Sequence, residues 1–169
     1  SAAARNVISG NNHFGVEIGG GAQNNLVQRN FIGTDITGAN ALGNSTAGVG
    51  FWSAGNLISG NAGAGVMVAN ASNGVAIQGN TIGLGVDGST VLANGQSGVQ
   101  VTGASINTLI GSDANGVNDA AERNVISGNL DTGVLIDGAG TTMTTVRGNT
   151  IGTDAAGAAA RGNFRGIMI

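Results

Sequence analysis

The chain has 169 residues, among them 33 glycines but no proline or cysteine; only 9% of the residues are charged, and the net charge is −3. This composition excludes a helical protein, because glycine and asparagine are poor helix formers, and it excludes disulfides and thiolate metal sites. Six basic residues against nine acidic ones attract phosphates weakly, and no long apolar run is present, so neither a nucleic-acid partner nor a membrane span is expected.

A seven-residue motif ending in Gly-Asn recurs from the N-terminus onward. It reads "RNVISGN" at 5–11, "GNLISGN" at 55–61 and "RNVISGN" again at 123–129. The residues that close the motif and its variants are Asn11, Asn30, Asn61, Asn80, Asn129 and Asn149, and Ser112 closes a weaker copy. Glycine and asparagine tolerate the backbone of tight corners, and stacked asparagines exchange amide hydrogen bonds. We interpret these asparagines as a structural ladder, and the seven anchors predict about seven rungs.

A second motif, "GVxI", lies between the anchors and predicts short strands. Its copies include "GVEI" at 15–18, "GVMV" at 65–68, "GVQV" at 98–101 and "GVLI" at 133–136. The two apolar residues of each copy share one face of a strand and point into a core. All copies run in the same direction, which favours stacked parallel strands over hairpins, and one rung alone is too small to fold. Because crossovers between parallel strands are right-handed, the sequence predicts an all-β, right-handed, single-stranded parallel β-helix, a solenoid that forms a single domain, 1–169.

Three longer segments interrupt the regular spacing. They are "IGTDITGANALGN" at 32–44, "IGLGVDGSTVLAN" at 82–94 and "IGTDAAGAAARGN" at 151–163. Each runs 12 residues from its isoleucine to its asparagine and is expected to form an outlying hairpin or loop on one side of the coil; we call these segments the excursions.

A calcium site is weighed at Asp35 and Asp154, which occupy matching places in the first and third excursions. Calcium takes six or more oxygen ligands, and one aspartate per loop supplies few of them. An aspartate in a glycine-rich turn commonly bonds to its own backbone instead. We favour that turn-capping role and expect no cofactor.

The alternation of "NVISGNxxxGVxI" with "GNxIGTDxxGxxxxGNxxxGVxI" resembles the right-handed parallel β-helix repeats of the pectate-lyase-like class, in the form found in long bacterial surface or secreted proteins. The resemblance covers essentially the whole chain, and it implies an extracellular or cell-surface location. Coils of this class include polysaccharide lyases, hydrolases and epimerases as well as the passive stalks of adhesins, so the resemblance leaves the function open.

No catalytic residue is predicted. A polysaccharide lyase of this class would carry a lysine or arginine base and calcium-binding carboxylates, and an epimerase would add tyrosine and histidine; this chain has no lysine and no tyrosine. Its one histidine, His13, precedes Glu17 by four residues in a turn and is expected to be solvated. We therefore interpret the chain as non-catalytic.

Two outward-facing columns are the candidates for partner contact. Ligand contacts are considered at Met67, Leu135 and Met168, the middle residues of "GVxI" copies, and at Trp52, against the alternative that neighbouring segments cover them. The residues two places before the anchors, which include Ser9, Ser59, Ile110 and Ser127, are expected to form a flat and largely polar strip.

Two functions remain open. The chain starts at "SAAARN" and stops at "GIMI" within a rung, so we expect a segment of a longer solenoid, or a subunit that self-associates end to end through open rungs. The favoured function is a structural or adhesive stalk of an extracellular bacterial protein. The alternative is a carbohydrate-binding or polysaccharide-active module, whose partner would be a polysaccharide.

Overall fold

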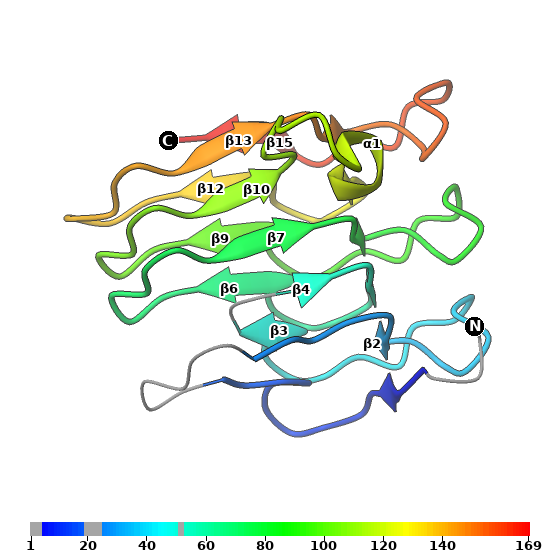
Figure 1. Ribbon diagram of the computed structural model, residues 1–169. Helices are drawn as coiled ribbons and strands as arrows, with labels where there is room; N and C mark the ends of the chain where they lie inside the picture. The colour runs from blue at the N-terminus through cyan, green and yellow to red at the C-terminus, as the bar shows by residue number, and fades with distance from the viewer. Residues whose placement is uncertain (1–4, 19–24, 51–52) are drawn as a thin grey trace.

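Short strands in three parallel sheets, joined by turns and loops, form the framework of the computed structural model, which describes residues 5–18, 25–50 and 53–169 (Figure 1). Sheet A contains β1 (Val7–Ile8), β2 (Phe31–Ile32), β5 (Leu57–Ile58), β8 (Thr81–Ile82), β11 (Val125–Ile126) and β14 (Thr150–Ile151). Sheet B contains β3 (Val49–Gly50), β6 (Val66–Val68), β9 (Val99–Val101), β12 (Thr132–Ile136) and β15 (Arg165–Met168). Sheet C contains β4 (Ser53–Ala54), β7 (Ala76–Gln78), β10 (Leu109–Gly111) and β13 (Thr145–Arg147), and one short helix, α1 (Asp119–Glu122), follows β10.

The strands stack in the order in which the chain makes them. From β2 onward the chain passes through sheets A, B and C in turn and then returns to sheet A beside the strand it made one turn earlier. In Figure 1 this produces a stack that rises from the N-terminal strands to the C-terminal ones. Every pairing between these strands is parallel. The arrangement is consistent with a parallel β-helix, as the one-way repetition of "GVxI" predicted.

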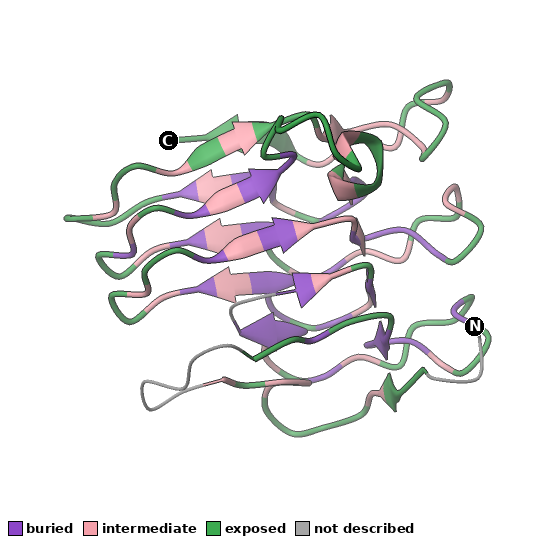
Figure 2. Cartoon of the chain, in the orientation of Figure 1, coloured by how far each residue is buried: buried purple, intermediate pink, exposed green. Residues whose placement is uncertain are grey.

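The core consists of apolar columns that run along the stack. In sheet B the outer residues of each "GVxI" copy are paired in register, as in Val66 with Val99 and Val99 with Val134, and all three are fully buried. Sheet A contributes a column of isoleucines, Ile8, Ile32, Ile58, Ile82, Ile126 and Ile151, which belong to the core or pack against it. Burial decreases toward the last strand, where Ile167 is 48% exposed (Figure 2).

Asparagines form two ladders, where the sequence predicted one. The first ladder lies where the chain passes from sheet C to sheet A and contains Asn6, Asn30, Asn56, Asn80, Asn124 and Asn149. The second lies where the chain leaves sheet A and contains Asn11, Asn44, Asn61, Asn94, Asn129 and Asn163. In each step the side-chain amide of one asparagine donates to Oδ1 of the asparagine in the next turn, at 2.7–3.2 Å. The six predicted asparagines are all in ladders, but they alternate between the two corners.

The predicted count of about seven rungs is wrong for the described residues, because sheet A has six strands and the stack therefore has six turns. The seventh anchor, Ser112, belongs to neither ladder. Ile110, which was expected in the outward strip, instead pairs with the core residue Ile77 and is fully buried. The chain then makes a loop containing α1 and returns to the first ladder at Asn124. Within the described ranges no helix has the length and apolar character needed to cross a bilayer.

Candidate functional site

The middle residues of the "GVxI" copies form one outward column on sheet B. Gly50, Met67, Gln100, Leu135 and Met168 are paired in register from β3 to β15. Leu135 and Met168 are therefore neighbours, and Gln100 separates Met67 from Leu135. Met67 and Leu135 are half-buried and Met168 is 46% exposed. The structure thus brings three of the four residues considered for ligand contact onto one face, while Trp52 lies outside the described residues.

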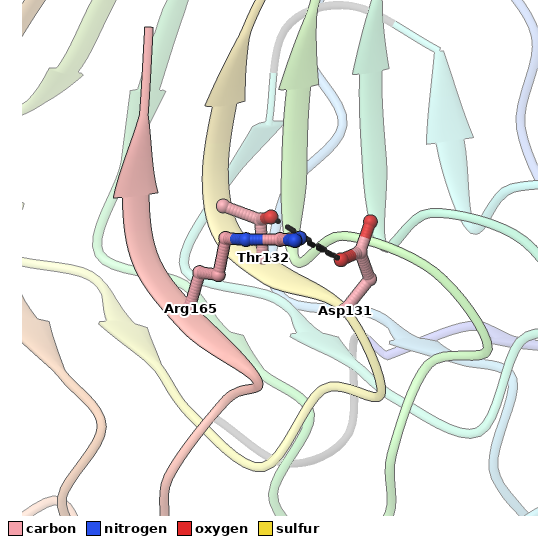
Figure 3. Close-up of polar contacts among 3 residues, drawn as sticks. All are labelled: Asp131, Thr132 and Arg165. Carbon is pink, nitrogen blue, oxygen red and sulfur yellow. Dashed lines mark hydrogen bonds and ion pairs between the residues drawn. The ribbon is translucent and has the colours of Figure 1, made fainter.

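An ion pair links the last two strands of sheet B beside this column. Arg165 Nη1 lies 3.3 Å from Asp131 Oδ1, and the hydroxyl of Thr132 donates to the same oxygen at 3.3 Å (Figure 3). Both charged side chains are about half exposed, so the pair contributes little to stability in water. Asp131 and Asp137 flank β12 at opposite ends and so do not form a carboxylate pair.

The three excursions are short hairpins that project from one side of the stack (Figure 1). Each is closed by an antiparallel bridge, Thr34 with Ala41 in the first, Leu84 with Val91 in the second and Thr153 with Ala160 in the third. Successive excursions also touch, although they belong to alternate turns. The backbone N–H of Val86 donates to Gly38 O, and that of Ala155 donates to Gly88 O. The excursions therefore form a second column outside the coil.

Arginine adds a side-chain link between the second and third excursions. Arg161 Nε donates to Ser89 O at 2.6 Å, and Arg161 Nη2 donates to Ser89 Oγ at 2.9 Å. The first pair of excursions shows no equivalent bond among the described residues, because Leu92 stands in the second excursion where Arg161 stands in the third.

Each excursion uses an aspartate to hold its own turn. Asp35 Oδ1 accepts the backbone N–H of Thr37, Ala39 and Asn40, and Oδ2 accepts the Asn40 amide at 2.7 Å. Asp154 Oδ1 accepts the N–H of Ala158. Asp35 and Asp154 lie in excursions that follow β2 and β14, with three other sheet A strands between those two. The structure does not bring these two residues, the ones considered for calcium, together.

The second excursion has its aspartate, Asp87, two residues later than the other two excursions. Asp87 also accepts hydrogen bonds from its own turn. Asp87 Oδ1 accepts the N–H of Ser89 and Thr90, and Oδ2 accepts the Thr90 hydroxyl. These donors stabilise the charged carboxylate. The hydrogen bond from the Thr90 side chain, followed by those from the Ser89 and Thr90 backbone, lowers the pKa of Asp87 to about 2.

The same physical cause acts in the other two excursions. Hydrogen bonds from the Asn40 and Thr37 side chains lower the pKa of Asp35, and those from the Ala158 and Ala159 backbone lower that of Asp154.

Acidification should loosen the second excursion below the ordinary carboxyl range. A carboxyl group whose pKa is lowered in the folded state stabilises that state above its unfolded pKa, and the contribution is lost as the pH falls through the folded pKa. For Asp87 that window runs from 3.8 down to about 2. We expect the side-chain carboxyl signal of Asp87 to titrate in nuclear magnetic resonance spectra near the lower limit, with the Ser89 and Thr90 amide signals following it. Titration at the ordinary value would contradict the assigned hydrogen bonds.

Serines at the base of the excursions face inward, where the sequence predicted an outward polar strip. Ser59 is fully buried; its hydroxyl donates to Leu84 O at 2.7 Å and accepts the N–H of Gly83 at 3.0 Å. Ser9 makes the same two bonds with Thr34 O and Gly33 N–H, and Ser127 accepts the N–H of Gly152. Each serine hydroxyl thus hydrogen-bonds to the base of the excursion in the following turn. These bonds require the hydroxyl to point inward.

Removing one of these hydroxyls should loosen the excursion above it. We expect Ser59→Ala to lower the free energy of unfolding by about 1–3 kcal/mol, because it leaves Leu84 O and the Gly83 N–H without their buried partner. Hydrogen exchange should accelerate at Gly83 in particular. The matched variant Ser9→Ala should lower the free energy of unfolding less than Ser59→Ala does, since Ser9 is only partly buried. An equal cost at the two sites would contradict this explanation.

Three carboxylates gather in the loop around α1. Oxygens of Asp113, Asp119 and Glu122 all lie within 4.8 Å of one another, as three ligands of a shared cation would. Two of these carboxylates also accept hydrogen bonds from the loop itself. Asp119 accepts the Ser112 hydroxyl and the Gly116 N–H, and Glu122 accepts the Asp113 N–H. These bonds close the loop over the top of β10.

The single histidine lies at the surface beside its expected neighbour. His13 Nδ1 is 3.8 Å from Glu17 Oε2, and both side chains are more than half exposed. The ring of His13 also packs edge-on against Phe14. The histidine is therefore solvated, as the sequence predicted. No family model, curated protein or solved structure matches the chain.

Proposed function

We propose that the chain is a rigid stalk segment of an extracellular bacterial protein, wound as a right-handed, single-stranded parallel β-helix of the pectate-lyase-like class. The handedness follows from the crossover rule for parallel strands, and the class and location follow from the resemblance in the repeats. Repeats of this kind stabilise one another only through their neighbours, so length can be added without a change in the core.

The observation that carries the stalk function is the continuity of the two ladders. Each joins six turns without a break, and most of its asparagines are buried. Buried hydrogen bonds of this kind are costly to break, because each one that opens leaves polar groups away from water. The ladders therefore resist shearing and stretching along the axis of the stack, which is the load that a stalk carries.

Limited proteolysis and stretching test the stalk function directly. The folded chain should resist thermolysin at a ratio that digests an unfolded control of equal length. In single-molecule stretching with handles at the two termini, extension should proceed by loss of successive turns. Prompt digestion at many sites, or smooth extension without discrete steps, would contradict a load-bearing role.

The alternative function is binding or processing of a polysaccharide. The in-register column of Met67, Gln100, Leu135 and Met168 favours this alternative, because it gives sheet B a linear strip of partly exposed side chains along which a polymer could lie. Binding to a glycan array, together with an assay for unsaturated uronates, distinguishes the two. The stalk function predicts no turnover and no saturable binding, and either result would favour the alternative.

A further inference from the structure

Three asparagines of the chain are followed directly by glycine: Asn73, Asn94 and Asn115. At such a step the glycine nitrogen can attack the side-chain carbonyl carbon of the asparagine, because glycine has no side chain to hinder the approach. The product is a cyclic imide, and the side-chain nitrogen leaves as ammonia. Water then opens the ring to aspartate or isoaspartate. The structure gives these three steps different surroundings.

The step at Asn94 belongs to the second ladder. Asn94 is fully buried, and its amide donates to Asn129 Oδ1 at 2.9 Å and to Ile58 O at 3.0 Å. The N–H of Gly95 donates to Asn61 O at 2.8 Å. Ring closure would have to turn this backbone and break the ladder, so Asn94 should be inert in the folded chain.

The step at Asn73 is exposed but tied to the next turn. Asn73 forms a parallel bridge with Ile106, and the N–H of Gly74 donates to Ile106 O at 3.2 Å. Asn73 Oδ1 accepts the side-chain amide of Asn107 at 3.0 Å. Attack at Asn73 would therefore have to break bonds between two turns.

The step at Asn115 lies in the exposed loop around α1. Asn115 donates its backbone N–H to Asp113 Oδ1 at 3.0 Å and its side-chain amide to Asp113 Oδ2 at 2.8 Å, both within the loop. Gly116 has a φ of +83°, and a methyl group placed on it would meet no atom within 4 Å. The backbone at this step can therefore turn without displacing a neighbouring turn of the stack.

Two groups of this loop lie where the reaction needs them. Asp119 Oδ2 accepts the N–H of Gly116 at 3.2 Å, which places the carboxylate within reach of the proton that a general base would take. The N–H of Val117 donates to Asn115 Oδ1 at 2.7 Å. Negative charge develops on that oxygen during the attack, and a donor already in place stabilises the charge. The loop thus supplies a base and an oxyanion donor to one asparagine.

We propose that this loop is a self-modifying site, in which Asp119 assists the deamidation of Asn115 by Gly116. The lone pair of Gly116 N forms a bond to Asn115 Cγ while the N–H proton passes to Asp119 Oδ2. The Cγ–Nδ2 bond then breaks, Asp119 returns the proton to Nδ2, and ammonia leaves. One water molecule hydrolyses the imide, supplying the hydroxyl of the new carboxyl group and the hydrogen of the restored amide.

The product changes the loop and leaves the stack in place. Conversion of Asn115 removes the amide that donates to Asp113 and adds a fourth carboxylate beside Asp113, Asp119 and Glu122. Like charges at close range repel one another, so the modified loop should open. None of these residues belongs to a ladder, and the inference is therefore independent of the stalk function.

Peptide mapping by mass spectrometry follows the three steps separately in the full chain, incubated at neutral pH either folded or unfolded in urea. Asn115 should convert at least tenfold faster in the folded chain, since only the folded loop positions Asp119 and Val117. Asn94 should convert only in urea, and it reports that the folded sample stays folded. Conversion of Asn115 that is slower in the folded chain than in urea, or absent, would overturn the proposal.

Asp119→Asn tests the base, because it keeps the size of the side chain and removes the carboxylate. Conversion of Asn115 in the folded chain should fall at least tenfold, and the remaining rate should rise about tenfold with each pH unit as hydroxide takes the proton instead. In urea the variant and the wild type should react equally.

The matched control is Glu122→Gln, which removes a carboxylate of the same cluster that accepts the Asp113 N–H instead. Its conversion of Asn115 should stay within about twofold of the wild type, because Asp119 remains in place. An Asp119→Asn chain in which Asn94 stays intact while Asn115 converts as fast as in the wild type would overturn the role of Asp119. An equal loss of rate in both variants would overturn it as well.

Discussion

Asn61→Ala is expected to lower the free energy of unfolding by roughly 2–5 kcal/mol. Asn61 is buried in the middle of the second ladder, where its Oδ1 accepts the Asn44 backbone N–H and side-chain amide. Its own amide donates to Asn94 Oδ1 and Ile32 O. Alanine removes the acceptor of the Asn44 backbone N–H and of one Asn44 amide hydrogen in a buried site, where the amide keeps only its bond to Ile8 O. Urea denaturation followed by circular dichroism measures the loss.

The matched variant Asn11→Ala removes the first asparagine of the same ladder. Asn11 is exposed and donates to Asn44, and it accepts no ladder bond among the described residues, so its loss should cost only about 1 kcal/mol. Asn61→Asp gives a further control, because it keeps the acceptor and removes the donors. Its buried carboxyl should have a raised pKa, so its stability should be greater at acid pH and decline as the pH rises through that pKa. If Asn61→Ala and Asn11→Ala lowered the free energy of unfolding equally, burial would not explain how much a ladder asparagine contributes to stability.

Gly83→Ala is expected to destabilise the fold more than Gly152→Ala, the same substitution at the matching position of the third excursion. Gly83 has a φ of +91°, and a methyl group on it would lie 2.6 Å from Asn129 Oδ1 and closer still to Ser127 O. The left-handed backbone costs an alanine about 1–2 kcal/mol, and displacing the next turn adds roughly 1–3 kcal/mol. The free energy of unfolding in dilute solution should therefore fall by roughly 2–5 kcal/mol.

Gly152→Ala separates the two contributions. Gly152 has nearly the same φ, +85°, but the space above it is open. Only the left-handed backbone should destabilise this variant, so its free energy of unfolding should fall by about 1–2 kcal/mol. If the two variants lost the same stability, contact with the next turn would not be the reason for the glycine at position 83.

Several features could be predicted because they depend on residues close together in the sequence. Alternation in "GVxI" determines which side chains of a strand share a face, and Val66, Val68, Val99 and Val101 are indeed fully buried. The longer spacing of the three excursions predicted outlying hairpins or loops, and the structure shows hairpins. The turn-capping role of Asp35 followed from its place in a glycine-rich turn, and the structure shows those bonds.

Other features could not be predicted because they depend on which turn lies above which. Both corners of a turn place an apolar residue three positions before the asparagine, as with Ile8 and Val27, so Asn11 and Asn30 look equivalent in the sequence although they belong to different ladders. A pattern visible in retrospect is that short turns place their two asparagines five residues apart, as in Asn56 and Asn61. Ser59 faces inward because an excursion made 24 residues later needs its hydroxyl.

The sequence by itself determined that the chain consists of short, parallel, stacked strands with asparagine corners and three excursions, since local side-chain periodicity decides which residues face inward. Only the tertiary structure decided that there are two ladders and six turns, that the serines face inward, and that Asp113, Asp119 and Glu122 come together. The physical reason is register: the partner of each residue lies a full turn away, and the length of a turn depends on loops whose closure the sequence does not specify.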